Sequence, residues 1–187
     1  MTKGKLYSRI ILKILERKRY TMNRIAEFIK VSKEQYLKDF DESFGSAEAA
    51  YECISIPARA TSGSAGYDFK APFDFTLAPG ETIKIPTGIR ARIDDGWVLM
   101  IFPRSGLGFK YRLQLNNTVG VIDSDYFGSD NEGHIMVKMT NCTNEGKTIS
   151  LKAGEGFAQG IFMPYGITAD DEVTDIRNGG FGSTTKK

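Results

Sequence analysis

The stretch ETIKIPTGIRARIDDGWVLMIFP, residues 81–103, alternates apolar with polar side chains and is interrupted by turn-forming residues. An alternation with a period of two places one set of side chains on one face of a β-strand. Two later runs, GHIMVKM (133–139) and GFAQGIFM (156–163), are also apolar, and clusters of Gly, Pro, Asn and Asp separate the runs. The pattern predicts an all-β barrel or sandwich in which strands recur roughly every ten residues.

The composition is that of an ordinary globular chain. It has 187 residues, of which 41% are hydrophobic and 26% charged, and this suits one domain with an extension. A net charge of +2 gives no reason to expect a nucleic-acid partner, and no apolar run is long enough to cross a membrane. Cys53 and Cys142 lack metal-ligand spacing, which favours free thiols in the cytoplasm. The single histidine, His134, excludes a His-cluster metal site, so any metal would be a hard cation with oxygen ligands.

The first 56 residues lack the regular alternation of short apolar runs and turn clusters, and they divide into two parts. Residues 1–21 form an N-terminal extension, read as a transit peptide or as a translated leader before a true start at Met22. Residues 22–56 superficially resemble a helix-turn-helix. We favour a strand over residues 24–31 followed by a helix that ends near residues 43–45, because Ser32 is a good N-cap with acidic and amide side chains after it.

Five segments stand out from the β pattern because they combine glycine with charged, hydroxyl or amide residues. They are ATSGSAGYDF (60–69), PRSGLG (103–108), NNTVGVIDSDYFG (116–128), GFAQG (156–160) and RNGGFGSTTKK (177–187). In the second, a cation, a hydroxyl and exposed N–H groups suit a phosphate cradle, although the Gly-Lys-Ser/Thr ending of a P-loop is absent. Plainer readings exist for single residues: Asp68 could cap a turn, Tyr126 could lie in the core, and Arg104 could pair with a surface acid.

The third segment contains a candidate general base. Asp123 follows Val119, Val121 and Ile122, so we expect partly dry surroundings in which its carboxylate accepts a proton from water. Asp125 places a second carboxylate two residues further on, and the two acids need not share a role.

In this order the five segments resemble the motifs of the homotrimeric deoxyuridine triphosphatase (dUTPase) family, over about residues 57–184. The motifs that carry the resemblance are GSAGYD, PRSGLG, GVIDSDY, AQ and GGFGST. The resemblance implies a jelly-roll-like β-barrel that forms a homotrimer with a short N-terminal helical extension. It also implies hydrolysis of dUTP to dUMP and pyrophosphate with Mg²⁺, which limits uracil in DNA and supplies dUMP. Residues 57–176 would be the β core and 177–187 a flexible lid.

The resemblance assigns residues to catalysis, metal binding and nucleoside recognition. Asp123 would deprotonate the water that attacks the α-phosphorus, and Asp68 would reach Mg²⁺ through water. Asn117 would read the uracil edge, helped by backbone groups up to Val121. Tyr126 would pack under the deoxyribose and exclude a 2′-hydroxyl.

The remaining residues implied by the resemblance bind phosphates or close the site. Arg104, Ser105 and Gly106 would hold phosphates of a nucleotide bound to a neighbouring chain, and Gln159 would lie near the α-phosphate. The tail residues that would close over the nucleotide are Arg177 at the γ-phosphate, Phe181 on the base, and Gly182, Ser183 and Thr184 as hydrogen-bond donors.

Three departures from the family pattern stand out. The acidic insertion SDNEG (129–133) precedes HIMVKM, Gly156 stands where many relatives carry Arg, and one residue fewer separates Arg177 from Phe181. Since some phage relatives bind host repressors, the insertion could contact a protein partner, and a regulatory binding module is an alternative function. A less favoured alternative is a dCTP deaminase, which would use a glutamate where this chain has the run at 123–126.

Overall fold

The computed structural model describes residues 23–175, and this part of the chain is mostly β-structure, as the sequence predicts. The helical elements are α2 (Lys33–Asp39), α3 (Ala47–Cys53), α4 (Ser105–Tyr111) and two short 3-10 helices, η1 (Glu42–Phe44) and η2 (Ser124–Gly128). The strands are β1 (Ala26–Lys30), β2 (Ala58–Arg59), β3 (Tyr67–Lys70), β4 (Phe75–Leu77), β5 (Thr82–Pro86), β6 (Ile89–Ile93), β7 (Trp97–Pro103), β8 (Leu113–Leu115), β9 (Gly120–Ile122), β10 (Met136–Asn141), β11 (Ile149–Leu151) and β12 (Gly156–Pro164).

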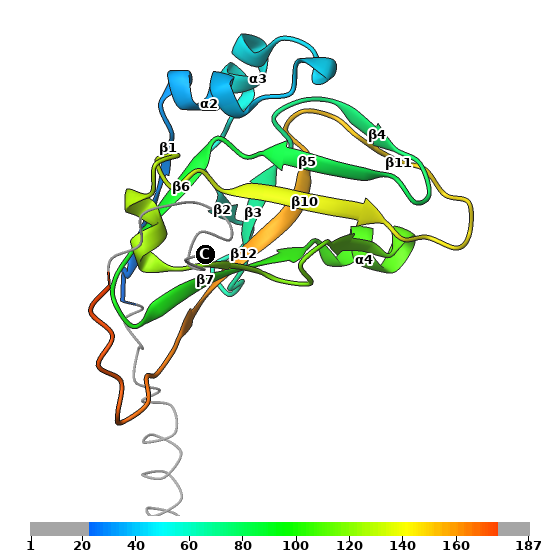
Figure 1. The fold of residues 1–187 in the computed structure, drawn as a ribbon. Coiled ribbons are helices and arrows are strands. Elements are labelled where there is room, and N and C mark those ends of the chain that lie inside the picture. The colour runs from blue at the N-terminus through cyan, green and yellow to red at the C-terminus, as the bar shows by residue number, and fades with distance from the viewer. Residues whose placement is uncertain (1–22, 176–187) are drawn as a thin grey trace, which may run out of the picture.

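The strands form four antiparallel hydrogen-bonded units within the described range. The largest sheet has the order β2-β3-β12-β7-β9, and a three-stranded sheet has the order β5-β10-β8. The pairs β1-β6 and β11-β4 complete the β-structure. Figure 1 shows β5 and β10 on one side of the molecule, with β7 and β12 crossing below them. In β12, Gln159 lies opposite Asp68 of β3 and Phe102 of β7, so segments distant in sequence meet on one sheet.

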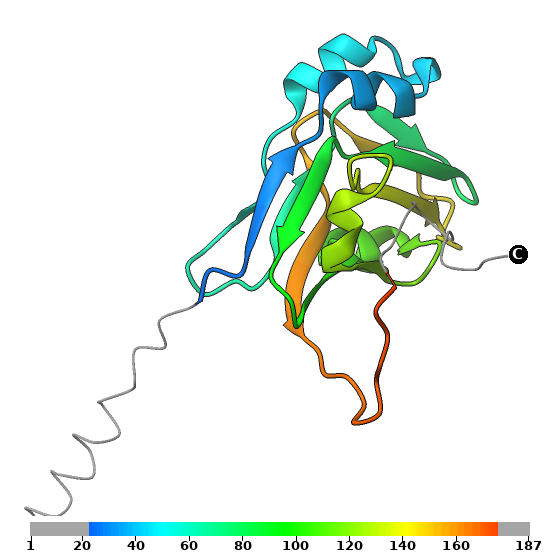
Figure 2. The ribbon, with the colours of Figure 1, turned by 60° about the vertical axis from the view of Figure 1, so that its left-hand side comes forward.

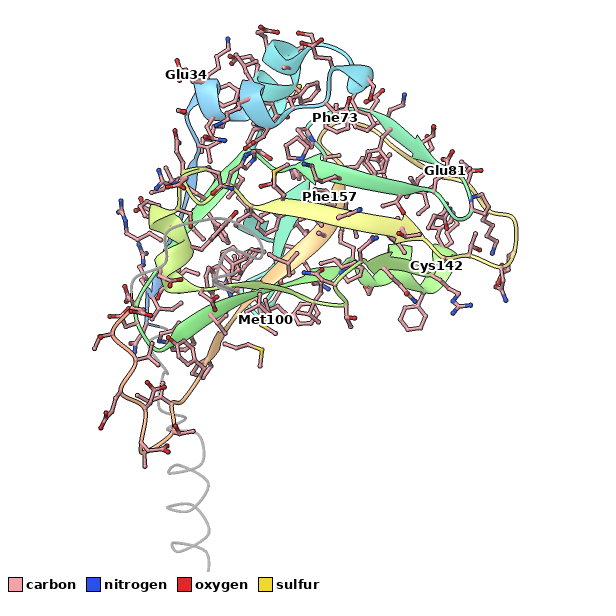
Figure 3. The ribbon with its side chains drawn as sticks, viewed as in Figure 1. Glu34, Phe73, Glu81, Met100, Cys142 and Phe157 are labelled. Carbon is pink, nitrogen blue, oxygen red and sulfur yellow. The ribbon has the colours of Figure 1, made fainter. Side chains whose placement is uncertain are left out.

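The core lies between these sheets and follows from the period-two alternation. Ile83 and Ile85 of β5 are 4% and 0% exposed, whereas their polar neighbours on the strand are exposed. Phe157 is fully buried and lies near the middle of the molecule (Figure 3). Burying each such side chain stabilises the fold by about 1.5–3 kcal/mol, which fixes the register of the strands.

The strand-then-helix interpretation of residues 22–56 is confirmed, and the helix-turn-helix reading is wrong. β1 pairs with β6, and the Ser32 side chain accepts a hydrogen bond of 3.1 Å from the Gln35 N–H at the start of α2. However, α2 ends at Asp39, and η1 and α3 follow it. We missed α3, whose N-cap Ser46 accepts from Ala49 N after Gly45 turns the chain at a φ of 107°.

Aromatic side chains attach this N-terminal segment to the β-structure. Tyr36 is fully buried against Phe40 and Tyr51, and Phe44 stacks on Phe73 with ring centroids 4.7 Å apart. Helices α2 and α3 therefore lie together at one end of the sheets (Figures 1 and 2). Among residues 23–175, no helix is long and apolar enough to span a membrane. The extension 1–21 and the lid 177–187 lie outside the described residues.

Candidate active site

The predicted phosphate-binding residues come together at the end of β7. Arg104 is the N-cap of α4, so Ser105 and Gly106 begin that helix. The Nε atom of Arg104 lies 3.4 Å from Oδ1 of Asp68 on β3, and both side chains are partly exposed. Gln159 donates from Nε2 to the Pro103 carbonyl at 3.3 Å. Two hollows adjoin here, and Arg104 and Ser105 line both of them. Asp68 and Gly106 line the hollow of about 640 Å³, and Gln159 lines the one of about 550 Å³.

At Gly156, where many relatives carry Arg, the Arg104 side chain lies over the backbone. A Cβ at Gly156 would lie 2.5 Å from Nη1 and 2.9 Å from Cδ of Arg104. The Arg104 side chain thus occupies the space that a side chain at position 156 would need, and it forms the ion pair with Asp68 itself. The plainer reading of Arg104, a pairing with an acid, is therefore also correct.

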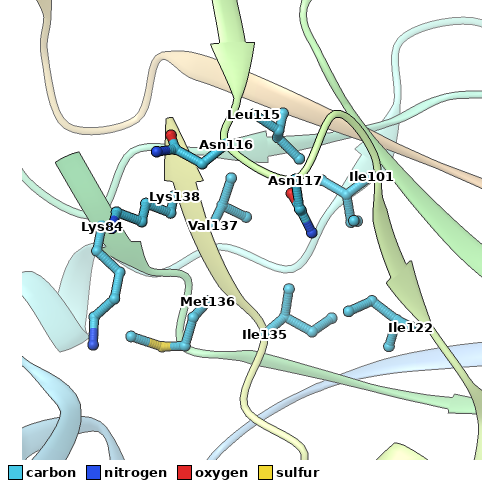
Figure 4. Close-up of a pocket in the computed structure, with 11 residues that line it drawn as sticks. Lys84, Ile101, Leu115, Asn116, Asn117, Ile122, Ile135, Met136, Val137 and Lys138 are labelled. Atoms are coloured by element: carbon cyan, nitrogen blue, oxygen red, sulfur yellow. The ribbon is translucent and has the colours of Figure 1, made fainter. Parts of the chain in front are cut away.

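The hairpin between β8 and β9 encloses an apolar cavity of about 480 Å³. Asn116 and Asn117 provide its amides, and Figure 4 shows the Asn117 side chain pointing between the apolar walls. Thr118 at the tip has a φ of +67°, which is unusual for a β-branched residue, and its N–H donates to Leu115 O at 2.9 Å. The apolar walls are Ile101, Leu115, Ile122, Ile135, Met136 and Val137. An apolar lining with the Asn117 amide directed into it suits a flat heterocycle, whereas the Asn116 side chain points away and accepts from the Thr140 hydroxyl at 2.9 Å.

Val121 does not line this cavity. Its side chain is 52% exposed, and its backbone pairs with Met100 on β7. Gly120 lines the cavity instead, and a Cβ there would lie 3.1 Å from Cβ of Ile101. The resemblance assigned Val121 a role through its backbone, and the outward direction of its side chain does not test that role.

The surroundings of Asp123 differ from those we predicted. Ile122 is buried, but Asp123 is exposed within one chain, because Val121 and Asp123 share the outward face of the strand. The strand also ends at Ile122, and Asp125 lies in the 3-10 helix η2, where it too is exposed. The partly dry surroundings that we expected for Asp123 are therefore not present within one chain.

Tyr126 lies in the same turn and is 4% exposed. Its hydroxyl donates to the His134 carbonyl at 2.8 Å and accepts from Nδ2 of Asn131 at 2.9 Å. Behind the turn, Arg90 donates from Nη2 to Phe127 O at 2.6 Å, and its guanidinium lies 3.6 Å from the centroid of the Phe127 ring. We missed Arg90, Asn131 and His134 in the sequence, although the insertion next to a motif was a signal.

A magnesium ion fits the cradle only in company with phosphates. Within residues 23–175, no group of three His, Cys, Asp or Glu side chains could enclose a metal. Asp68 offers one partly buried carboxylate at the hollow that Arg104 and Ser105 line. Mg²⁺ keeps several waters and often binds through one carboxylate and substrate phosphates, so the donor set suits water-mediated contact.

Known proteins resemble this chain over most of its length. A dUTPase family model matches residues 52–185. The deoxyuridine 5′-triphosphate nucleotidohydrolase of Lactococcus lactis is 46% identical over 134 residues, which cover 70% of this chain and 88% of that relative. The dUTPase from Streptococcus mutans, known from its crystal structure, is 37% identical to this chain. The structural match covers 75% of this chain and 97% of the Streptococcus chain, with a TM-score of 0.57.

A phage enzyme has the same fold at lower identity. The dUTPase of Staphylococcus bacteriophage 80alpha, solved with dUPNHPP, is 19% identical, covers 88% of this chain and 100% of its own, and has a TM-score of 0.59. This likeness concerns the fold alone. Together with the family model and the Lactococcus relative, the apolar cavity and the cationic cradle lead to one conclusion: the chain belongs to the dUTPase family.

Proposed function

We propose that this chain hydrolyses dUTP to dUMP and pyrophosphate, with Asp123 as the base that takes a proton from the attacking water. The observation that carries the proposal is the cavity at the β8–β9 hairpin, where the Asn117 amide meets apolar walls. The same chain supplies a phosphate cradle at Arg104 and Ser105. Base and triphosphate thus each have a matching surface.

Selection of uracil follows from the Asn117 amide. An amide offers one donor and one acceptor, which match the acceptor and donor on the pairing edge of uracil, whereas cytosine presents the reverse pattern. Most of the cavity wall is apolar, so an unmatched polar edge of the base finds few protein partners there. Leaving a buried polar group unpaired costs about 1–3 kcal/mol, and this penalty disfavours dCTP.

Phosphate binding exchanges one partner of Arg104 for another. The Arg104–Asp68 pair is partly exposed, and such pairs contribute about 0–1 kcal/mol. A phosphate offers the guanidinium shorter, bidentate hydrogen bonds. Arg104 can therefore leave Asp68 at little cost, and this frees the Asp68 carboxylate for a hydrated Mg²⁺, which when bound would neutralise charge on the triphosphate.

The complete site is proposed to form between chains of a homotrimer. The apolar cavity and the hollow beside Gln159 share no lining residue, so one chain holds the two halves apart. Asp123 is exposed, and a neighbouring chain would supply the drier surroundings that a base needs. Phe109 of α4, 93% exposed beside the cradle, fits burial against such a neighbour. The tail 177–187 would close the site from a third chain.

The test is pyrophosphate release from each deoxynucleoside triphosphate by the wild type and by Asp123→Asn. We expect release from dUTP alone, and a loss of about 10²–10⁴-fold in Asp123→Asn, because general bases contribute by that factor. Equal turnover by the variant would refute the role of Asp123. Ammonia released from dCTP would instead favour the deaminase.

A protein partner at the acidic insertion finds no support in its contacts. Glu132 binds Ser32 within the chain, and Gly133 is buried. Within the insertion, Asp130 alone is exposed. We therefore keep hydrolysis as the proposed function and assign the insertion a role inside the chain.

A further inference from the structure

We propose that the insertion and the N-terminal segment together position Tyr126, and so set the discrimination between deoxyribose and ribose, with Asn131, His134 and Asp39 as positioning residues. The inference rests on the proposed function and on the role that the resemblance gives Tyr126, whose ring would pack under the deoxyribose. It concerns the residues behind that ring, which lie outside the motifs that resemble the family.

The insertion contacts the catalytic turn directly, in two ways. Asn131 and the His134 carbonyl hold the Tyr126 hydroxyl from two sides, at 2.9 and 2.8 Å. Gly133, with a φ of +69°, packs so closely that a Cβ there would lie 2.6 Å from Tyr126 O and 2.8 Å from Phe127 Cα. The Asn131 side chain is itself held, since its Oδ1 accepts from Gly133 N at 3.2 Å. The ring therefore has one defined position.

The insertion is in turn fixed to the N-terminal segment. Both carboxylate oxygens of Glu132 accept from Ser32, one from the backbone N–H at 2.8 Å and one from the hydroxyl at 2.6 Å. Arg90 lies 3.9 Å from the same carboxylate and also donates to Phe127 O. Ser32 caps α2, so the helix, the insertion and the turn form one connected unit.

His134 provides the second connection, and its tautomer follows from its partners. Its ring is fully buried, and Gly88 N–H donates to its Nε2 at 2.8 Å. The proton of the neutral ring must therefore lie on Nδ1, which donates to Oδ2 of Asp39 at 2.6 Å. Gln35 donates to the same oxygen at 2.7 Å. Because Asp39 orients the His134 ring, it also fixes the carbonyl that receives the Tyr126 hydroxyl.

Loss of one of these contacts would loosen the ring without removing it. A relaxed ring leaves room for a 2′-hydroxyl, so UTP gains relative to dUTP. The energy of one hydrogen bond, about 1 kcal/mol, corresponds to roughly a fivefold fall in the ratio of kcat/KM for dUTP to that for UTP. A role in stability alone would lower Tm and leave this ratio unchanged.

The experiment compares two matched pairs of variants of the full-length chain. In the insertion, Asn131→Ala removes the contact to Tyr126, and Asp130→Ala alters the exposed neighbour. In the N-terminal segment, Asp39→Ala removes the hydrogen-bond partner of the His134 ring. The control is Asp41→Ala, which removes only the N-cap of η1, the carboxylate that accepts from the Ser43 N–H. We expect Asn131→Ala and Asp39→Ala to lower the dUTP:UTP ratio about fivefold, Asp39→Asn to restore most of it, and both controls to keep the wild-type ratio.

A double-mutant cycle keeps the inference testable if a variant is unstable. Tyr126→Phe keeps the ring but lacks the hydroxyl, so adding Asn131→Ala to it should lower the ratio no further. The inference is overturned if Asn131→Ala keeps the wild-type ratio, or if its effect persists in full beside Tyr126→Phe. A wild type that fails to hydrolyse dUTP would refute the proposed function instead.

Discussion

Replacing Gly133 by alanine should disturb the catalytic turn by a predictable amount. The new Cβ would lie 2.6 Å from Tyr126 O and 2.8 Å from Phe127 Cα, about 0.6–0.8 Å inside ordinary van der Waals contact. Both neighbours are backbone atoms, so the turn must move. A left-handed conformation adds about 1–2 kcal/mol for a residue with a Cβ. Asp123 and Tyr126 share that turn, and a misplacement of about 1 Å can lower turnover about 10²-fold.

Gly146→Ala is the matched control for this change. Gly146 has a φ of +70°, but a Cβ there would have no heavy atom within 4 Å, so alanine carries the backbone strain alone. Steady-state hydrolysis of dUTP and thermal unfolding of both variants separate strain from contact. We expect both variants to lose stability, and only Gly133→Ala to lose kcat by about tenfold or more. Equal kcat in the two variants would contradict the assignment of the insertion as a support of the turn.

The remaining predictions concern the assembly, the tail and pH. Co-expression of Asp123→Asn with Arg104→Ala should restore activity at about one quarter of the sites if each site takes these residues from different chains; no recovery would refute shared sites. Deleting residues 177–187 should leave the oligomer intact in light scattering but sharply reduce dUTP turnover. Hydrogen bonds from Ser32 hold the pKa of Glu132 below its usual range, so the unfolded chain binds more protons there. The resulting stability is present above the unfolded pKa and is lost as pH falls through the lower folded pKa, and Tm should fall more steeply towards about pH 3 in the wild type than in Glu132→Gln.

Features that depend on local periodicity could be predicted from the sequence. The alternation in β5 indicated both the strand and its buried face, because a period of two is a property of neighbouring residues. Ser32 likewise predicted the start of α2. The pattern did not reveal that β9 ends at Ile122 and that Asp125 lies in η2. Nothing in the pattern marked the change from strand to 3-10 helix, since a single acidic residue favours neither element clearly.

Features that depend on contacts distant in sequence could not be predicted. Ser32 and Glu132 are 100 positions apart, and neither forms part of a motif. The Gly156 departure was visible in the sequence, but the position of the Arg104 side chain over this glycine depends on the register of β12 against β7. The sequence identified the positions at which the chain deviates from its family. The fold showed which distant residues these positions contact: Ser32 for the insertion and Arg104 for Gly156.

The two deviations in the described chain have a common physical logic. At Gly156 the loss of a side chain makes room for Arg104, which is then held near Asp68 by a weak, partly exposed pair until phosphate replaces it. At the insertion the added residues do the opposite, because Asn131 and Gly133 leave Tyr126 no alternative position. In the proposed function, Arg104 exchanges Asp68 for phosphate and is loosely held, whereas Tyr126 excludes a 2′-hydroxyl and is tightly held. On that proposal, interchanging these properties would impair both tasks, since a rigid Arg104 could not leave Asp68 and a mobile Tyr126 could not reject ribose.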